Sequence, residues 1–195
     1  IIMNDYECIT KCFKTVIEML EDRNYTIPDD ILNLTPNDYR YMYNNNKYNF
    51  NVSDGNKTCY IMFFLNSSGN VKINSVREYI NNLDKKDNDE FLIILKNINT
   101  SLKKLKKEFN FNLFEYKRLQ VNITKHSYVP KHELIKKEKE KEILNLYNIT
   151  NKLNLPCILV TDAVCKYYNF KSGRILKITR NSRTSGKTIG YRYIK

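Results

Sequence analysis

Three short runs of aromatic and β-branched residues, separated by segments with helical periodicity, constrain the fold of this chain most strongly. The runs cover residues 58–65, 91–95 and 111–116, and each has the length and apolar content of a buried strand. Between the first two runs, Ser75 is placed to cap a helix with one apolar face, and a second helix-forming segment precedes the third run. This order of strand, helix, strand, helix and strand predicts an α/β layer with parallel strand pairs.

The segment that precedes these runs is predicted to be helical. In residues 5–21 the apolar side chains recur at the three–four spacing of one helix face, and Asn24 follows as the expected stop. A second, shorter helix is expected to begin at Thr35, because its hydroxyl can cap the helix while Pro36 occupies the first turn.

The composition changes near residue 118, and a different pattern of elements follows. We expect a short strand at 119–124 and a highly charged helix at 132–147. The remaining expected elements are a short helix capped by Asp162 and a hairpin-like pair of strands at 174–179 and 188–194.

Two domains fit this order of elements better than one. We predict an α/β protein with a mixed α/β domain over residues 1–118 and a small α+β domain over residues 119–195. Hydrophobic residues make up 42% of the chain and charged residues 28%, which is typical of a folded protein. No apolar run of about 18 residues occurs, so we predict no membrane span and no membrane partner.

The net charge indicates which partners the chain favours, and the cysteines indicate which kinds of site it lacks. The formal net charge is +12, with 33 Lys and Arg against 21 Asp and Glu, which favours polyanionic partners such as nucleic acid or an acidic protein surface. Five scattered cysteines without a CxxC pair are typical of neither a disulfide framework nor a zinc site, and they indicate a reducing compartment. His126 and His132 have no Cys or carboxylate at ligand spacing. We therefore expect these histidines to be structural or interface residues rather than metal ligands or acid–base groups.

The second domain carries an ordered series of short motifs, and their order is more specific than any one of them. The series comprises Leu119-Gln120-Val121-Asn122-Ile123-Thr124-Lys125-His126, Val129-Pro130-Lys131-His132, Leu155-Pro156, Asp162-Ala163-Val164, Tyr167-Tyr168, Lys171-Ser172-Gly173, Leu176-Lys177-Ile178-Thr179-Arg180-Asn181-Ser182, Thr184-Ser185-Gly186 and Tyr191-Arg192. It resembles the C-terminal assembly domain of the fifth-subunit family of eukaryotic DNA-directed RNA polymerases, shared by polymerases I, II and III, a domain that also forms the whole of the corresponding archaeal polymerase subunit. The first domain resembles the jaw domain of this family, through Phe13-Lys14-Thr15-Val16 and Asp22-Arg23-Asn24-Tyr25.

The resemblance implies a non-catalytic structural subunit of a multisubunit RNA polymerase, with no metal, no cofactor and no catalytic residue of its own. Its C-terminal domain would anchor to the largest polymerase subunit, other polymerase subunits would be further partners, and the jaw would contact downstream double-stranded DNA. The chain would not form a homo-oligomer. It would act in the nucleus, or in a cytoplasmic viral factory or virion if a large DNA virus encodes it. The implied interface residues are His126, Pro130, His132, Arg180, Ser182, Tyr191 and Arg192.

A lysine-rich segment of the first domain is the candidate for DNA contact. Thr100 and Ser101 can begin a helix, and hydroxyls and amides at a helix start can contact phosphate. The lysines that follow would add attraction that does not depend on base sequence; they are Lys103, Lys104, Lys106 and Lys107. The same lysines also fit a solvated helix face with Leu102 and Leu105 turned inward, and the two interpretations are compatible.

Two other functions are weighed against this one. Asp29 after Pro28, together with Glu115 and Lys117, can be forced into a PD…ExK nuclease pattern, in which carboxylates bind a divalent metal. Their spacing is far too long, and Asp29 precedes a helix rather than lying on a strand. A free-standing basic DNA-binding protein would explain the charge but not the ordered motifs of the second domain.

Overall fold

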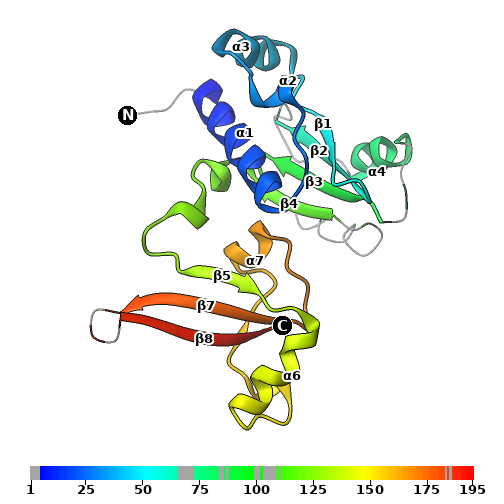
Figure 1. The fold of residues 1–195 in the computed structure, drawn as a ribbon. Helices are drawn as coiled ribbons and strands as arrows, with labels where there is room; N and C mark the ends of the chain where they lie inside the picture. The colour runs from blue at the N-terminus through cyan, green and yellow to red at the C-terminus, as the bar shows by residue number, and fades with distance from the viewer. Residues whose placement is uncertain are drawn as a thin grey trace. The chain divides into compact units, whose positions relative to one another are not determined.

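The chain divides into two compact units, Ile1–Val121 and Asn122–Lys195, called here the N-terminal and C-terminal units (Figure 1). The computed structural model describes residues 5–65, 73–83, 86, 88–98, 102, 109, 111–182, 184 and 186–195. The division falls after Val121, rather than after residue 118, where the composition changes. In the described part of the chain, no helix combines the length and the apolar character needed to cross a bilayer.

The N-terminal unit is built on a four-stranded sheet with the order β1-β2-β3-β4. Its elements are α1 (Asp5–Asp22), α2 (Asp29–Leu32), α3 (Pro36–Asn45), β1 (Phe50–Ser53), β2 (Thr58–Phe64), α4 (Ile73–Asn81), β3 (Glu90–Leu95), β4 (Phe111–Glu115) and the 3-10 turn η1 (Tyr116–Leu119). Strands β2, β3 and β4 run parallel to one another, whereas β1 pairs with β2 in the antiparallel direction. The predicted α/β class and parallel pairs are confirmed, and β1 is an addition that the sequence pattern did not predict.

The two helices predicted before the sheet are present. Helix α1 buries its apolar stripe, including Phe13 and Val16, and the chain turns at Asn24, whose φ of 64° lies in the left-handed region that asparagine tolerates. Thr35 caps α3: its hydroxyl accepts a hydrogen bond from the Asp38 N–H at 3.3 Å, and the Asp38 carboxylate accepts one from the Thr35 N–H at 2.8 Å. This reciprocal pair is a capping box, which satisfies backbone donors that a helix start otherwise leaves open.

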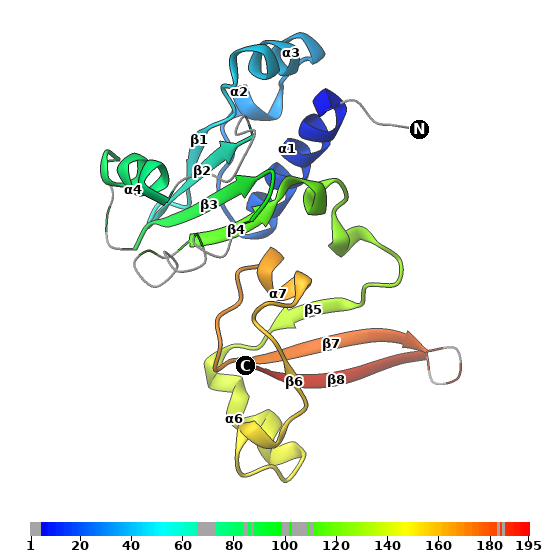
Figure 2. The same cartoon turned by 180° about the vertical axis from the view of Figure 1, so that it is seen from behind.

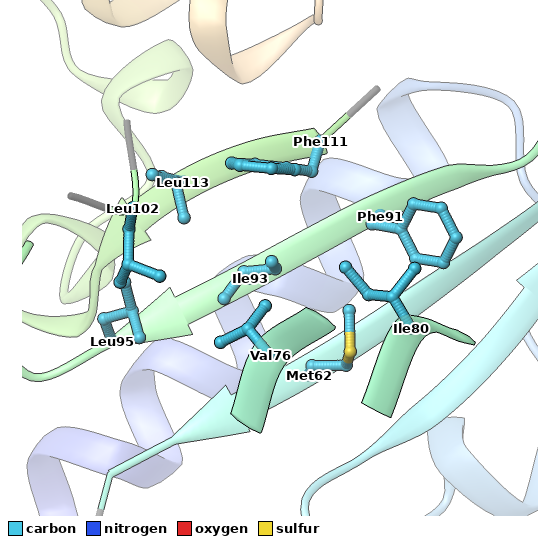
Figure 3. Close-up of a cluster of buried hydrophobic side chains, with 9 residues drawn as sticks. All are labelled: Met62, Val76, Ile80, Phe91, Ile93, Leu95, Leu102, Phe111 and Leu113. Carbon is cyan, nitrogen blue, oxygen red and sulfur yellow. The ribbon is translucent and has the colours of Figure 1, made fainter. Parts of the chain in front are cut away.

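Helices cover both faces of this sheet (Figures 1 and 2). On one face, Phe13 of α1 stacks on Phe63 of β2, with ring centroids 5.8 Å apart. On the other, α4 contributes Val76 and Ile80 to a core with side chains of β2, β3 and β4 (Figure 3). Strand β3 is buried along its whole length because it is central and covered on both faces. Helix α4 begins at Ile73, so the prediction of Ser75 as its cap was wrong.

The C-terminal unit contains a second four-stranded sheet with the order β5-β7-β8-β6. Its elements are the 3-10 turn η2 (Ile123–Lys125), β5 (Lys131–Leu134), α6 (Lys137–Leu146), the 3-10 turn η3 (Lys152–Asn154), β6 (Cys157–Ile158), α7 (Ala163–Tyr167), β7 (Ile175–Ser182) and β8 (Gly186–Ile194). Strands β5 and β8 flank β7 in antiparallel pairs, and β6 runs parallel to β8. Cys165 of α7 packs with Leu176 and Ile178 of β7 in the core of this unit.

Two predicted elements of the C-terminal region were wrong, and local bonds explain the first. Residues 119–124 were expected to form a strand but belong to the 3-10 turns η1 and η2 and their connection. The Asn122 side chain accepts a hydrogen bond from the Thr124 N–H at 3.0 Å, and its amide donates to the Tyr167 hydroxyl at 2.9 Å. Such a side chain offers the backbone a partner that competes with strand pairing. The expected helix at 132–147 is divided between β5 and α6.

The other two expectations for this region hold, with one extension. Asp162 caps α7, since its carboxylate accepts a hydrogen bond from the Val164 N–H at 2.9 Å. The hairpin is present but longer than expected, because β7 and β8 remain paired as far as Ser182 and Gly186. Gly186 has a φ of 68°, a left-handed conformation that glycine adopts without steric cost at the end of a short hairpin loop.

Candidate interaction surface

The seven residues predicted to form a subunit interface all lie in the C-terminal unit, but its sheet distributes them over different surfaces. Residues paired directly across antiparallel strands share a face. His132 of β5 is paired with Ile178, and Arg192 of β8 is paired with Leu176, so both lie on the face that carries the core beneath α7. Arg180 lies two residues beyond Ile178 on the same strand and therefore on the same face.

We call His132, Arg180 and Arg192, together with Asp162 at the start of α7, the His–Arg cluster. Asp162, Arg180 and Arg192 each act electrostatically on the His132 ring, which places the four side chains in one neighbourhood. The Arg192 guanidinium is held there by donating a hydrogen bond from Nη1 to the Cys157 carbonyl at 3.3 Å. One imidazole, two guanidinium groups and one carboxylate make this a predominantly basic site.

The His132 ring is held in one orientation by its own strand. Its Nδ1 lies 2.7 Å from the Pro130 carbonyl oxygen, and because a carbonyl can only accept, Nδ1 carries the hydrogen. Partial burial lowers the pKa of His132 below its ordinary value, and Arg180 and Arg192 lower it further, against the opposing effects of the Pro130 bond and Asp162. Near neutral pH the ring is therefore uncharged, and its Nε2 is an acceptor.

This pKa shift predicts a specific dependence of stability on pH. Since the folded state disfavours protonated His132, the unfolded state binds more protons once the pH falls below about 6.5, the ordinary pKa of histidine. The free energy of unfolding of the C-terminal unit should therefore decrease as the pH falls from 7 to 5. Replacing His132 with Gln, which does not titrate, should flatten this decrease, as measured by urea denaturation at pH 7, 6 and 5.

The second histidine of the chain provides the control for that measurement. His126 is exposed, and the variant His126→Gln measures how the loss of an exposed imidazole affects the same slope. Equal slopes for the wild type and His132→Gln would show that His132 does not carry the effect.

The remaining predicted interface residues lie away from the cluster. His126 accepts a hydrogen bond at Nδ1 from the Tyr128 N–H at 3.3 Å, so the two imidazoles have different partners. Tyr191 lies on the opposite face of the sheet, where its ring packs edge-on against Tyr147 at 5.7 Å. Ser182 is at the end of β7, with its hydroxyl 3.2 Å from that of Thr184. Within the described ranges, no group of three or more His, Cys, Asp and Glu side chains is arranged to hold a metal ion.

Sequence reasoning missed the position of Asp162 beside His132. Its capping role was predicted from local sequence, but its proximity to the imidazole depends on how α7 packs on the sheet. The basic character of this site could have been found from the sequence: residues 171–195, which include β7 and β8, contain eight Lys or Arg and no Asp or Glu.

The residues predicted to contact DNA lie outside the described residues. They are Thr100, Ser101, Lys103, Lys104, Lys106 and Lys107.

The residues of the alternative nuclease pattern lie within the described part of the chain. Asp29 begins α2, and Glu115 ends β4, where it pairs with Arg118 at 3.3 Å. Asp29 therefore lies on a helix and does not supply the strand-borne carboxylate that such a site uses.

Comparison with known proteins gives matches in both units. Residues 8–83 match the family described as RNA polymerase Rpb5, N-terminal domain, and residues 121–194 match RNA polymerase Rpb5, C-terminal domain. The subunit rpabc1 of DNA-directed RNA polymerases I, II and III from Dictyostelium discoideum is 30% identical over 197 residues, which cover 97% of this chain and 98% of that protein.

Two further relatives come from a plant and an archaeon. Subunit 5A of DNA-directed RNA polymerase V from Arabidopsis thaliana is 29% identical over 189 residues, which cover 91% of this chain and 84% of the relative. The DNA-directed RNA polymerase subunit Rpo5 from Nitrosopumilus maritimus is 41% identical over 78 residues, which cover 40% of this chain and 93% of the relative.

Proposed function

The chain belongs to the Rpb5 family of RNA polymerase subunits, and from that membership we propose that it is a non-catalytic subunit anchored to the largest polymerase subunit through its C-terminal unit. The N-terminal unit would contact downstream double-stranded DNA. The chain would act in the nucleus, or in a cytoplasmic viral factory or virion if a large DNA virus encodes it.

The observation that carries the anchoring proposal is the concentration of positive charge on the C-terminal sheet. Residues 171–195 contain eight basic and no acidic residues, and Arg180 and Arg192 share one face with the uncharged His132. A basic face of this kind favours an acidic surface on a protein partner, because complementary charges speed association and fix the orientation of docking. Arginine is also among the residues enriched in protein interfaces.

Cross-linking of the assembled polymerase tests this proposal. The enzyme would be purified through a tag on this chain, treated with an amine-reactive cross-linker, and analysed by mass spectrometry. We expect links from Lys131, Lys177 and Lys187, which lie on β5, β7 and β8, to the largest subunit. Links to the largest subunit that come only from the N-terminal unit would contradict anchoring through the C-terminal unit.

Contact with DNA is the second part of the proposal, and it rests on the sequence of the lysine-rich segment. Replacing Lys103, Lys104, Lys106 and Lys107 with Glu should weaken retention of downstream DNA by the assembled polymerase. Each lost phosphate contact should also reduce the slope of log affinity against log salt by about 0.9. The measurement is the fraction of a labelled template retained by the purified enzyme at several salt concentrations.

A matched control reverses the same number of charges elsewhere. Lys136, Lys137, Lys139 and Lys141 are exposed lysines at or near the start of α6, where added negative charge is compatible with the helix dipole. The control variant with four Glu there should retain DNA like the wild type. Equal retention by the test variant and the wild type at every salt concentration would refute the proposed contact.

A further inference from the structure

Strand β8 has one edge that is paired with β7 along its whole length and one edge that is mostly open. The pairs with β7 run from Tyr193 to Gly186 without interruption. On the other side, β6 pairs with β8 only at Tyr193 and Ile194. Among the described residues, no strand pairs with this outer edge between Lys187 and Tyr191. Figure 2 shows β6 beside only the C-terminal end of β8.

The direction of the backbone groups along this edge follows from the bonds at its end. The Tyr193 N–H donates to the Pro156 carbonyl at 2.9 Å, away from β7, whereas the Ile194 N–H donates to the Arg174 carbonyl at 2.9 Å, on the β7 side. In an antiparallel pair these directions alternate from residue to residue. The N–H and C=O groups of Lys187, Ile189 and Tyr191 therefore point outward, and those of Thr188 and Gly190 point toward β7.

This edge lacks most of the features that protect exposed strands from pairing. The register of β7 and β8 is unbroken, so there is no bulge, and residues 187–191 contain no proline and a single charge, Lys187. The Ile189 side chain is 46% exposed. An open, regular edge with an exposed apolar side chain is suited to accept another extended chain, since the backbone bonds supply affinity and the side chains supply selectivity.

The surrounding charge specifies the chemistry of that chain. Arg180 and Lys187 are exposed on the hairpin, whose residues 171–195 contain no acidic side chain, and Asp162 is the one acidic member of the neighbouring His–Arg cluster. The alternating N–H and C=O groups match a peptide backbone, whereas a phosphate backbone offers only acceptors. We propose that the edge Lys187–Tyr191 receives an extended, acidic segment of the largest polymerase subunit as an additional strand. This inference rests on the proposed function and specifies how the docking occurs.

Amide hydrogen exchange with single-residue resolution tests the added strand. The isolated full chain would be compared with the polymerase purified through a tag on the chain. The outward amides of Lys187, Ile189 and Tyr191 should exchange rapidly in the isolated chain and at least about tenfold more slowly in the polymerase, because exchange requires a broken hydrogen bond. The amides of Thr188 and Gly190 should be protected in both samples.

A pair of variants tests the same edge through its backbone. Ile189→Pro removes one outward N–H at a position where proline is compatible with an edge strand, whereas Ile189→Thr keeps that N–H and a β-branched side chain. We expect recovery of the largest subunit to fall about tenfold for the proline variant and to stay near the wild-type level for the threonine variant. Thermal unfolding of each isolated variant is the control: a midpoint equal to that of the wild type would show that loss of recovery is not caused by unfolding.

The outcomes separate this inference from the function on which it rests. Recovery of the largest subunit without protection of the outward amides would overturn the added strand and leave the anchoring proposal standing. Failure to recover that subunit with the wild-type chain would overturn the anchoring itself. Protection produced by adding a DNA duplex to the isolated chain would assign the edge to nucleic acid and overturn the inference.

Discussion

Replacing Phe13 with alanine is expected to lower the free energy of unfolding of the N-terminal unit by about 3–5 kcal/mol, the usual cost of removing a large buried aromatic side chain. Phe13 is 1% exposed and lies at the centre of a group of rings from α1, α3, β1, β2 and the segment before β1. Its centroid lies 5.3 Å from that of Phe50 and 5.8 Å from that of Phe63. The substitution would leave a cavity beneath the sheet and remove these ring contacts.

The decrease in the free energy of unfolding is measured most directly by hydrogen exchange of the Met62 and Ile93 amides, which lie in neighbouring strands of the N-terminal sheet. Leu176 and Ile178 in the C-terminal unit serve as an internal reference that should not change. Tyr41→Ala is the control, because Tyr41 is an aromatic residue of α3 that is 58% exposed, and its removal should cost less than about 1 kcal/mol. A loss below about 1 kcal/mol for Phe13→Ala would contradict the assigned core.

Reversing the charge of both arginines in the His–Arg cluster is expected to reduce recovery of the largest polymerase subunit by at least about tenfold. A tenfold change corresponds to about 1.4 kcal/mol of binding free energy. In the proposed docking, Arg180→Glu with Arg192→Glu would place two carboxylates against an acidic partner surface, and like charges opposed across an interface cost several kcal/mol. The measurement is the ratio of the largest subunit to the tagged chain after affinity purification.

The control for this experiment changes the net charge by the same amount. Lys137→Glu with Lys139→Glu reverses two exposed charges in the first turn of α6 and should leave recovery near the wild-type level. An equal loss in both double variants would show that net charge, and not the His–Arg cluster, determines recovery. Unchanged recovery for the arginine variant would contradict docking through this face.

The parts of the fold that local sequence controls could be predicted, and those that depend on distant pairing could not. Helix α1, the capping box at Thr35 and the three parallel strands follow from periodicity, capping chemistry and apolar runs within one segment. Strand β1 was missed because only one of its four residues, Val52, is buried and the strand depends on pairing with β2. Strand β5 was assigned to a helix because its pairing with β7 brings together segments that are far apart in the sequence.

Two further errors have local causes. Residues 119–124 alternate apolar and polar side chains like a strand, but the Asn122 side chain bonds its own neighbouring backbone and the buried Tyr167 hydroxyl. In the outer part of the hairpin, Asn181 and Ser182 pair with Lys187 and Gly186, but these residues show no apolar–polar alternation, so this part resembled a loop.

For the candidate site, the sequence supplied the residue types and the structure supplied their grouping. His132, Arg180 and Arg192 were predicted individually, and the register of β5, β7 and β8 gathers them on one face while it places Tyr191 on the other. The proximity of Asp162 and the open edge of β8 are tertiary features without a local sequence signal.

The central claim is that this chain is a polymerase subunit anchored to the largest subunit, and the most direct test is affinity purification of the tagged chain from its native cells with quantitative mass spectrometry. The account predicts that the two largest polymerase subunits are recovered in equal amounts with the tagged chain, together with the other subunits of the enzyme. Recovery of the chain alone, or with DNA and without the large subunits, would contradict it.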